Sequence, residues 1–333
     1  MGARSSSAVF MLAAALVAAC GTGGSNNSVQ SGPTKISVGY SNVSVDFLAT
    51  WVAKEAGIFD KNGLDVDLQL VSGGSRTMAA LLSGEMQISL QGGAEALSAS
   101  AGSADVVVLG TLAPVYPYKF EVSPSVTTPN DLKGKKVGIS SVGGSADIAT
   151  RVALPKIGLD PDRDVQIVPV ESHANRTAAL LSGQIQGAMD DPPDSVELER
   201  RGLHPLFDLA QLKLPAAQTV IAARASWLGG HHDVAQRVVD SIVQAIARAK
   251  KDKAFTVGVM KKYFKSDDEQ AMSIAYDFFM NQVTPSLPYP KAEQFADSQH
   301  FLGQNNKRVH DYPISKLIND SFMRSAANRG LDK

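Results

Sequence analysis

The chain is poor in cysteine and in excess charge of either sign. Cys20 is the only cysteine among 333 residues, so no intramolecular disulfide holds the fold. The charges of the acidic and basic side chains nearly cancel. The formal net charge of −1 shows no excess of basic residues of the kind that indicates nucleic-acid binding. After Cys20 no run of about eighteen apolar residues occurs, so we expect no further membrane-spanning segment.

Signatures of catalysis are also missing. The sequence contains no Gly-x-Ser-x-Gly, no His-Glu-x-x-His and no Walker A loop. Ser145 follows two glycines, but no base can be assigned to it from the sequence. His231 and His232 precede an apolar helical pattern, which favours a helix start over a metal site. We therefore expect no enzyme, no cofactor and no metal.

The N-terminus has the pattern of an export signal. A positive charge precedes Val9–Ala19, an apolar run of signal-peptide length. The run ends at Cys20, and Leu16–Gly21 resembles the bacterial lipobox, in which the cysteine is lipidated and becomes the first residue. A plain signal peptide with a chance cysteine is the alternative. We expect a signal peptide over 1–19, followed by a lipidated Cys20 and a flexible tether over 20–34.

A six-residue stretch, AALLSG, occurs at Ala79–Gly84 and again at Ala178–Gly183. Around each copy, strand and helix patterns alternate in the same order, which predicts two similar α/β units with largely parallel sheets. In both copies we expect the leucines to pack a helix onto its sheet, and the serine and glycine to end that helix. The stretch is then structural, and its duplication matters because it places a cleft between two lobes.

The C-terminal third is mostly helical and has no counterpart in the second unit, so we expect it to pack on the first lobe. The chain must then cross between the lobes twice, near Ala113–Phe120 and near Gln218–Ala223. The predicted fold is α/β, with two Rossmann-like lobes joined by two crossing segments. In this prediction residues 35–115 and 222–333 form lobe 1, and residues 116–221 form lobe 2.

The loops at one edge of each predicted sheet are candidates for ligand binding. Ligands of open α/β sheets bind outside the carboxyl ends of the strands. Three of these loops lead into helix N-termini, whose free N–H groups and partial positive charge suit an anion. Serine hydroxyls add donors, although each serine can instead cap a helix. The candidate ligand-binding residues are Ser41, Asn42, Gly74, Ser75, Gln91, Gly92, Ser141, Gly144, Ser145, Asp190 and Asp191.

Other side chains near these loops have open interpretations. Asp190 or Asp191 could pair with an amine on the ligand, or could be a solvated turn residue. Arg76 and Arg176 begin the two repeated helices, where each could bind an anion or belong to the scaffold. Four aromatic residues could wall the cleft or fill the lobe cores: Tyr40, Phe47, Tyr116 and Tyr118.

Four stretches between about Lys35 and the C-terminus carry a resemblance to a known family. They are Ala53–Phe59, Gly63–Leu68, Leu82–Glu85 and Asp131–Gly138. Together they resemble the substrate-binding proteins of bacterial ABC importers, in the group that binds sulfonates, taurine, nitrate and thiamine pyrimidine precursors. The resemblance implies a type II periplasmic binding fold. Gln87 and Gln186 depart from the pattern, because aspartate is common there, and we expect a structural consequence.

The resemblance implies an extracytoplasmic lipoprotein, monomeric and anchored at Cys20, that delivers a small organic or anionic solute to the permease subunits of an ABC importer. The two lobes would close around the ligand at a hinge, and the solute would leave chemically unchanged. Two alternatives stay open. One is an enzyme of the same fold in thiamine or menaquinone biosynthesis, and the other is a ligand-sensing subunit of a membrane receptor.

Overall fold

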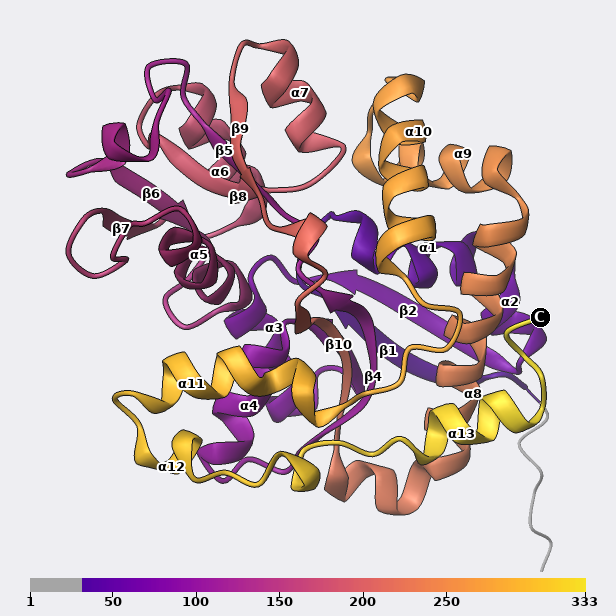
Figure 1. Cartoon of the computed structure of the whole chain (residues 1–333). Helices are drawn as coiled ribbons and strands as arrows, with labels where there is room; N and C mark the ends of the chain where they lie inside the picture. Colours follow the sequence, from indigo (N-terminus) through magenta and orange to yellow (C-terminus); the bar gives the residue numbers. More distant parts are fainter. Residues whose placement is uncertain (1–31) are drawn as a thin grey trace, which may run out of the picture. The chain divides into compact units, whose positions relative to one another are not determined.

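Two five-stranded sheets organise residues 32–333, the part of the chain that this computed structural model describes (Figure 1). The first sheet has the order β2-β1-β3-β10-β4, with β1 at Thr34–Tyr40, β2 at Leu64–Leu70, β3 at Ile88–Gln91, β4 at Val106–Val115 and β10 at Pro215–Arg224. The second has the order β7-β6-β8-β5-β9, with β5 at Lys119–Val122, β6 at Lys136–Ile139, β7 at Gln166–Pro169, β8 at Gly187–Asp190 and β9 at His204–Asp208. The predicted signal peptide and Cys20 lie outside the described residues.

Both sheets are mixed, and they are mixed in the same way. In the first sheet β1 runs parallel to β2 and β3, while β10 pairs antiparallel with β3 and β4. In the second sheet β6 runs parallel to β7 and β8, while β5 pairs antiparallel with β8 and β9. The strand that pairs antiparallel with both of its neighbours is β10 in the first sheet and β5 in the second. Each of them is the first strand after the chain passes over from the other sheet. The prediction of two similar α/β lobes is confirmed, and each sheet with its helices is called a lobe below.

Helices connect the parallel strands of both lobes. In the first lobe they are α1 at Leu48–Glu55, α2 at Ile58–Lys61, α3 at Gly74–Ser83 and α4 at Gly93–Ala101. In the second lobe they are α5 at Ser145–Lys156, α6 at His173–Leu181 and α7 at Asp194–Arg200. In the edge strand β2 the alternation of apolar and acidic residues separates the two faces of the sheet. Leu64 and Val66 are buried, while Asp65 and Asp67 are exposed.

The duplicated AALLSG stretch occupies equivalent places in the two lobes. The first copy ends α3 between β2 and β3, and the second ends α6 between β7 and β8. Leu81 and Leu180 are buried against their sheets. Gly84 and Gly183 have φ values of 85° and 73°, the left-handed region that glycine reaches without strain. The structural interpretation of the repeat is therefore confirmed.

The two glutamines that depart from the family pattern make equivalent bonds. Gln87 accepts from the backbone N–H of Ser37 at 2.9 Å, and Gln186 accepts from that of Lys136 at 3.2 Å. Each side-chain amide also donates to the glycine carbonyl that follows its helix, Gly84 or Gly183. Both side chains thus fasten the start of one strand to its neighbour, which is the structural consequence expected from the sequence.

The C-terminal third contacts both lobes, which is broader than predicted. Its helices are α8 at Ala225–Lys251, α9 at Lys253–Phe264, α10 at Glu269–Phe278, α11 at Ala296–Gly303, α12 at Lys307–His310 and α13 at Ser321–Asn328. The long helix α8 packs on α1 and is broken by non-helical backbone at His231. By contrast, α11 lies between α4 of the first lobe and α5 of the second, and Leu302 contributes to the cores of both.

The two crossings between the lobes lie at 116–118 and 209–214. The first agrees with the expected region. The second was expected near Gln218–Ala223, but those residues form part of β10 and pair with β3 and β4. Residues 215–221 therefore belong to the first sheet rather than to lobe 2. The error arose because a crossing strand has the same apolar pattern as the sheet that it joins.

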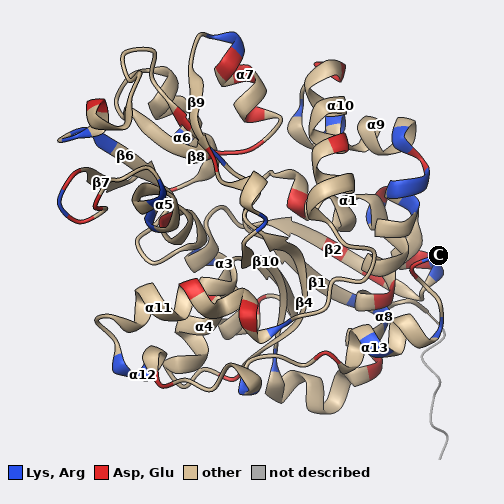
Figure 2. Cartoon of the chain, in the orientation of Figure 1, with Lys and Arg blue, Asp and Glu red and all other residues tan. Residues whose placement is uncertain are grey.

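Charged residues are mixed along the described surface. Figure 2 shows Lys and Arg interspersed with Asp and Glu on the helices of both lobes in this view, in keeping with the net charge of −1. Among the helices of residues 32–333, none combines the length and the apolar character that a membrane crossing requires.

Candidate functional site

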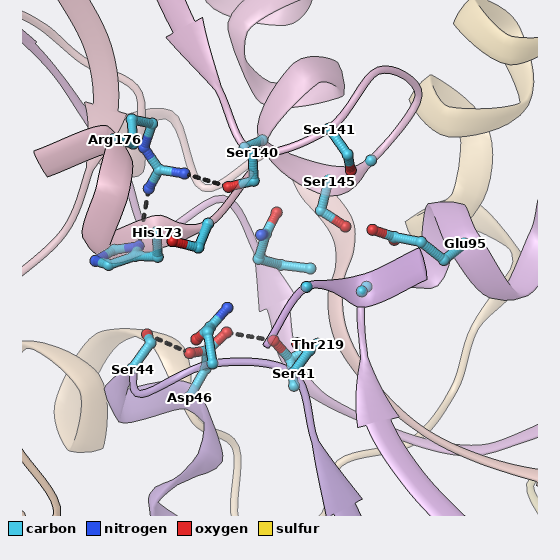
Figure 3. Close-up of a pocket in the computed structure, with 18 of the residues that line it drawn as sticks. Ser41, Ser44, Asp46, Glu95, Ser140, Ser141, Ser145, His173, Arg176 and Thr219 are labelled. Carbon is cyan, nitrogen blue, oxygen red and sulfur yellow. Dashed lines mark hydrogen bonds between the residues drawn. The ribbon is translucent and has the colours of Figure 1, made fainter. Parts of the chain in front are cut away.

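A cavity of about 60 Å³ lies between the two lobes, where loops from both sheets converge (Figure 3). Ser41 follows β1, Gly92 follows β3, Ser141 follows β6 and Asp191 follows β8. The carboxyl ends of the parallel strands in both sheets therefore face the same space, as the sheet architecture requires. The crossing strand β10 adds Thr219 from the side.

Eight of the eleven predicted residues line this cavity. They are Ser41, Asn42, Gly74, Gly92, Ser141, Gly144, Ser145 and Asp191. Their contact with a ligand stays a prediction, but the structure brings them together from loops as far apart in the sequence as Ser41 and Asp191. The lining also contains residues that were not predicted, above all Asp46, Glu95, His173 and Gln218.

Three predicted residues lie elsewhere. Ser75 is exposed in the first turn of α3, whose N-cap is Gly73 rather than the serine. Gln91 is fully buried within β3, and its amide nitrogen lies 3.7 Å from the sulfur of Met78. Asp190 is the last residue of β8, and its side chain turns into the second lobe. The loops were predicted correctly, but the face to which each side chain points was not.

The two neighbouring aspartates have different surroundings. Asp190 accepts a hydrogen bond from Thr177 at 3.0 Å and lies 3.3 Å from Nε2 of His173. Asp191 lines the cavity instead. Burial raises the pKa of Asp191 well above its usual range, and the facing carboxylate of Asp46 adds to the rise although His173 opposes it. Of the two candidates for pairing with a ligand amine, Asp191 is the one that faces the cavity.

Arg176 and His173 form a buried network on the second-lobe wall. Arg176 donates to Oγ of Ser140 at 2.9 Å, and its other terminal nitrogen lies 2.8 Å from Nδ1 of His173. Nε2 of His173 lies 2.7 Å from the Asp194 carboxylate. Burial lowers the pKa of His173, but the charges of Asp190 and Asp194 outweigh it and raise the pKa to about 9. Arg176 and His173 are thus largely engaged within their own lobe.

The same cluster has the spacing of a metal site. His173, Asp190 and Asp194 offer ligand atoms that lie within 4.8 Å of one another, the only such group among residues 32–333. The guanidinium group of Arg176 contacts the imidazole ring from the other side. A second cation at this point would face that positive charge, so the geometry favours the ion-pair network over a metal.

Asp46 supplies the acidic wall of the first lobe. It lies in the 3-10 turn Val45–Phe47, is 7% exposed, and accepts hydrogen bonds from Ser44 at 2.5 Å and from Thr219. Figure 3 shows these three side chains opposite the Arg176 network. Within residues 32–333 no salt bridge reaches Asp46. The side-chain carboxyl group is held by hydroxyl groups and forms no ion pair with another residue of this part of the chain.

Glu95 is the second acidic group of the first-lobe wall. It lies in the first turn of α4 and points towards Ser145, the first residue of α5 in the other lobe (Figure 3). Burial raises the pKa of Glu95. Its Oε2 atom and Oγ of Ser145 are both buried without a hydrogen-bond partner among the described residues. The carboxylate therefore lies at the N-terminus of a helix from the opposite lobe.

Three of the predicted glycines surround this carboxylate. A Cβ atom at Gly74, Gly92 or Gly144 would lie 2.4, 2.2 or 2.9 Å from a carboxylate oxygen of Glu95. These distances are shorter than any ordinary contact with carbon, so no larger residue fits without moving Glu95. The three glycines were predicted as ligand-binding residues, and in the structure the Glu95 side chain occupies the space beside them.

The aromatic candidates divide between the cavity and other places. Phe47 and Tyr118 line the cavity, whereas the hydroxyl group of Tyr116 donates to Asp297 at 3.0 Å outside it. Tyr40 borders a separate groove of about 860 Å³ between α9 and α6, whose walls include Tyr263. His173 borders both spaces, so the groove runs along the outer side of the cavity wall.

A family model matches residues 44–254, which include the second sheet, every strand of the first sheet except β1, and most of the cavity wall. Its description is NMT1/THI5-like. Among curated proteins, YtlA of Bacillus subtilis, which is named as a binding protein, is 24% identical over 293 residues, covering 86% of this chain and 88% of that protein.

Solved structures with the same fold come from binding proteins and from an enzyme. The aliphatic sulphonate binding protein SsuA of Escherichia coli superposes with a TM-score of 0.68 at 21% identity, covering 88% of this chain and 99% of that one. A zinc-bound ligand-binding component of an ABC-type import system of Staphylococcus aureus gives 0.73 at 16% identity, covering 88% and 99%. The desulfurization enzyme DszB gives 0.64 at 17% identity, covering 89% and 99%. At such identities the likeness shows the fold alone.

Proposed function

The chain belongs to the NMT1/THI5-like family, and from this membership we propose that it is the solute-binding lipoprotein of an ABC-type importer. In this proposal the protein acts outside the cytoplasm and captures one small polar solute between its lobes. It then presents the closed form to permease subunits, which receive the solute unchanged. The partners are thus a small molecule, a membrane permease and a lipid anchor at Cys20.

One observation carries the proposal. The cavity is walled by loops from two separate sheets, and only the segments 116–118 and 209–214 connect them through the backbone. A site split in this way is completed when the lobes close and is opened when they part, which suits capture and release. Hinge closure of this kind also explains why a binding site would need loops from both halves of the chain.

The anchor and the location are proposed from the sequence. The apolar run before Cys20 and the Gly- and Ser-rich stretch after it suit an exported lipoprotein with a flexible tether. Replacing Cys20 with alanine in the full chain tests this, because we expect the variant to leave the membrane fraction and appear in soluble extracts. Retention of Cys20→Ala on the membrane would contradict lipid anchoring at this residue.

Thermal unfolding against a solute panel tests the binding proposal. Pro33–Lys333 forms one compact unit and can be produced without the anchor. The panel would contain sulfonates, taurine, nitrate, pyrimidine precursors and small amines. A solute at a hundred times its dissociation constant adds about 2.7 kcal/mol, which raises the Tm of a protein of this size by about 5 °C. Recovery of the solute unchanged supports import, whereas its conversion would favour an enzyme that shares the fold.

A further inference from the structure

The charges that face the cavity are unbalanced. Asp46 and Asp191 lie on opposite walls, one from each lobe, and the charge of Asp46 is among the causes that raise the pKa of Asp191. The two carboxyl groups are therefore close enough to repel each other. Closure without a ligand therefore favours a proton on Asp191, whereas a cation between the two groups would allow both carboxyl groups to ionise.

The basic side chains of the wall are engaged with other partners. Arg176 binds Ser140 and His173, and His173 binds Asp194. Arg176 keeps one buried N–H, at Nε, without a partner. Three carboxyl groups, those of Asp46, Glu95 and Asp191, line the same cavity. A solute that supplies N–H donors and positive charge would therefore satisfy more of the wall than an anion would.

One of the helix N-termini at the cavity, that of α5, is already occupied by a carboxylate. The twelve-residue helix α5 begins at Ser145, and the Glu95 carboxylate of the other lobe lies against that residue. A sulfonate or nitrate at the same place would meet a fixed acidic group as well as the helix dipole. Glu95 thus takes the position that the sequence assigned to an anionic ligand.

We propose that the solute carries a protonated amine or amidine whose N–H groups lie between Asp46 and Asp191, and that Glu95 excludes anions from the N-terminus of α5. This proposal rests on the proposed binding function. Carboxylate and hydroxyl oxygens accept hydrogen bonds, so a primary amine or an amidine fits better than a quaternary ammonium group, which has no N–H. The three carboxyl groups also lack the close spacing of a metal site.

Probes of matched size and opposite charge test the solute class. We expect ethylamine and acetamidine at saturating concentration to raise the Tm of Pro33–Lys333 by about 5 °C, and ethanesulfonate and nitrate to leave it unchanged. Asp46→Asn should weaken amine binding tenfold or more, while the exposed control Asp60→Asn should not. Stabilisation by ethanesulfonate but not by amines would overturn this proposal and leave the binding function standing. If no probe and no other solute of the panel binds, the binding function itself fails.

A second variant tests the role of Glu95 without requiring loss of binding. Glu95→Gln removes the charge at the N-terminus of α5, and we expect ethanesulfonate to stabilise this variant although it does not stabilise the unmodified chain. Glu85→Gln, an exposed change on the same lobe, serves as the control. If ethanesulfonate fails to bind Glu95→Gln while the variant remains folded, Glu95 is not the group that excludes anions.

Discussion

Gly92 has room for a hydrogen atom and nothing larger in this arrangement of the lobes. A Cβ atom there would lie 2.1 Å from Oγ of Ser145, which belongs to the opposite lobe, and 2.2 Å from Oε2 of Glu95. Its backbone, with φ of −65° and ψ of 144°, is open to alanine. We predict that Gly92→Ala folds normally but closes incompletely, so that solute binding weakens at least tenfold and X-ray scattering shows no compaction on ligand addition.

Gly258→Ala is the matched control for this change, because Gly258 lies in α9 with nothing within 4 Å of its would-be Cβ. The control should bind solute as the unmodified chain does. Tight binding by Gly92→Ala would mean that the lobes can accommodate the methyl group, and the close approach of Gly92 to Ser145 would then have no role in closure.

The buried carboxyl group of Glu121 should make the stability of the folded chain depend on pH. It is fully buried on β5, neither carboxylate oxygen has a partner, and burial followed by the charge of Glu199 raises its pKa from 4.5 to about 8. The folded state therefore holds a proton that the unfolded chain releases between these values. Stability contributed by the neutral form is complete below pH 4.5 and is lost as the pH rises through 8.

Glu121→Gln should remove this pH dependence. At pH 7 the difference between folded and unfolded pKa values corresponds to about 3 kcal/mol, so we expect the variant to gain about 5 °C in Tm relative to the unmodified chain between pH 4.5 and pH 8. Thermal unfolding at both pH values measures this gain directly. An equal Tm difference at the two pH values would show that Glu121 does not titrate in this range.

At the residue scale the sequence predicted the loops of the site but not its charges. Asp46 and Glu95 each lie in the first turn of a helix, where acidic residues are common for reasons of the helix dipole alone, so neither stands out. The inward orientation of Arg176, by contrast, has a signal in the sequence. When the two AALLSG copies are aligned, Arg176 matches the buried Thr77 rather than the exposed Arg76, because one residue is missing before the second copy. That shift of one position could have predicted its inward orientation.

At the element scale, α7 and α10 join the lobes at a point remote from the cavity. Arg200 of α7 forms a salt bridge with Asp268 and donates to Gln270 at 2.9 Å, both at the start of α10. The ion pair is partly exposed, so its contribution to closure is small. We predict that Arg200→Ala weakens solute binding two- to fivefold and shifts the unliganded chain towards the open form.

Distance measurements between a label on α7 and one on α10 report this shift. With saturating solute both chains should reach the same short distance, because the solute supplies most of the closing energy. Arg201→Ala is the control, since Arg201 pairs with Glu197 within the second lobe. An unchanged distance distribution in Arg200→Ala without solute would exclude α7 and α10 as a contact that favours closure.

The order of elements was predictable, whereas their pairing between lobes was not. Alternating patterns and the repeated stretch identified two α/β units, and the serine and glycine of each repeat placed the ends of α3 and α6 correctly. The position of α11 against both α4 and α5 depends on contacts between distant parts of the chain, which leave no local pattern. The crossing before β10 was misplaced for the same reason, since a strand pattern does not say which sheet it joins.

At the scale of the whole molecule, the two lobes place unlike chemistry on the two sides of one space. The first lobe contributes Asp46 and Glu95, and the second contributes Asp191 together with the Arg176 network. Neither lobe alone can surround a solute. Binding should therefore depend on closure, and radii of gyration from X-ray scattering should fall when solute is added to Pro33–Lys333.

Mass spectrometry of the solute retained by the protein is the most direct test of this account. Pro33–Lys333 would be incubated with small molecules extracted from growth medium, separated from unbound material and then denatured. We expect one released compound at about one equivalent, identical to a compound in the extract and carrying an amine or amidine. A released compound that differs chemically from everything supplied would contradict a binding protein, as would the retention of no small molecule at all.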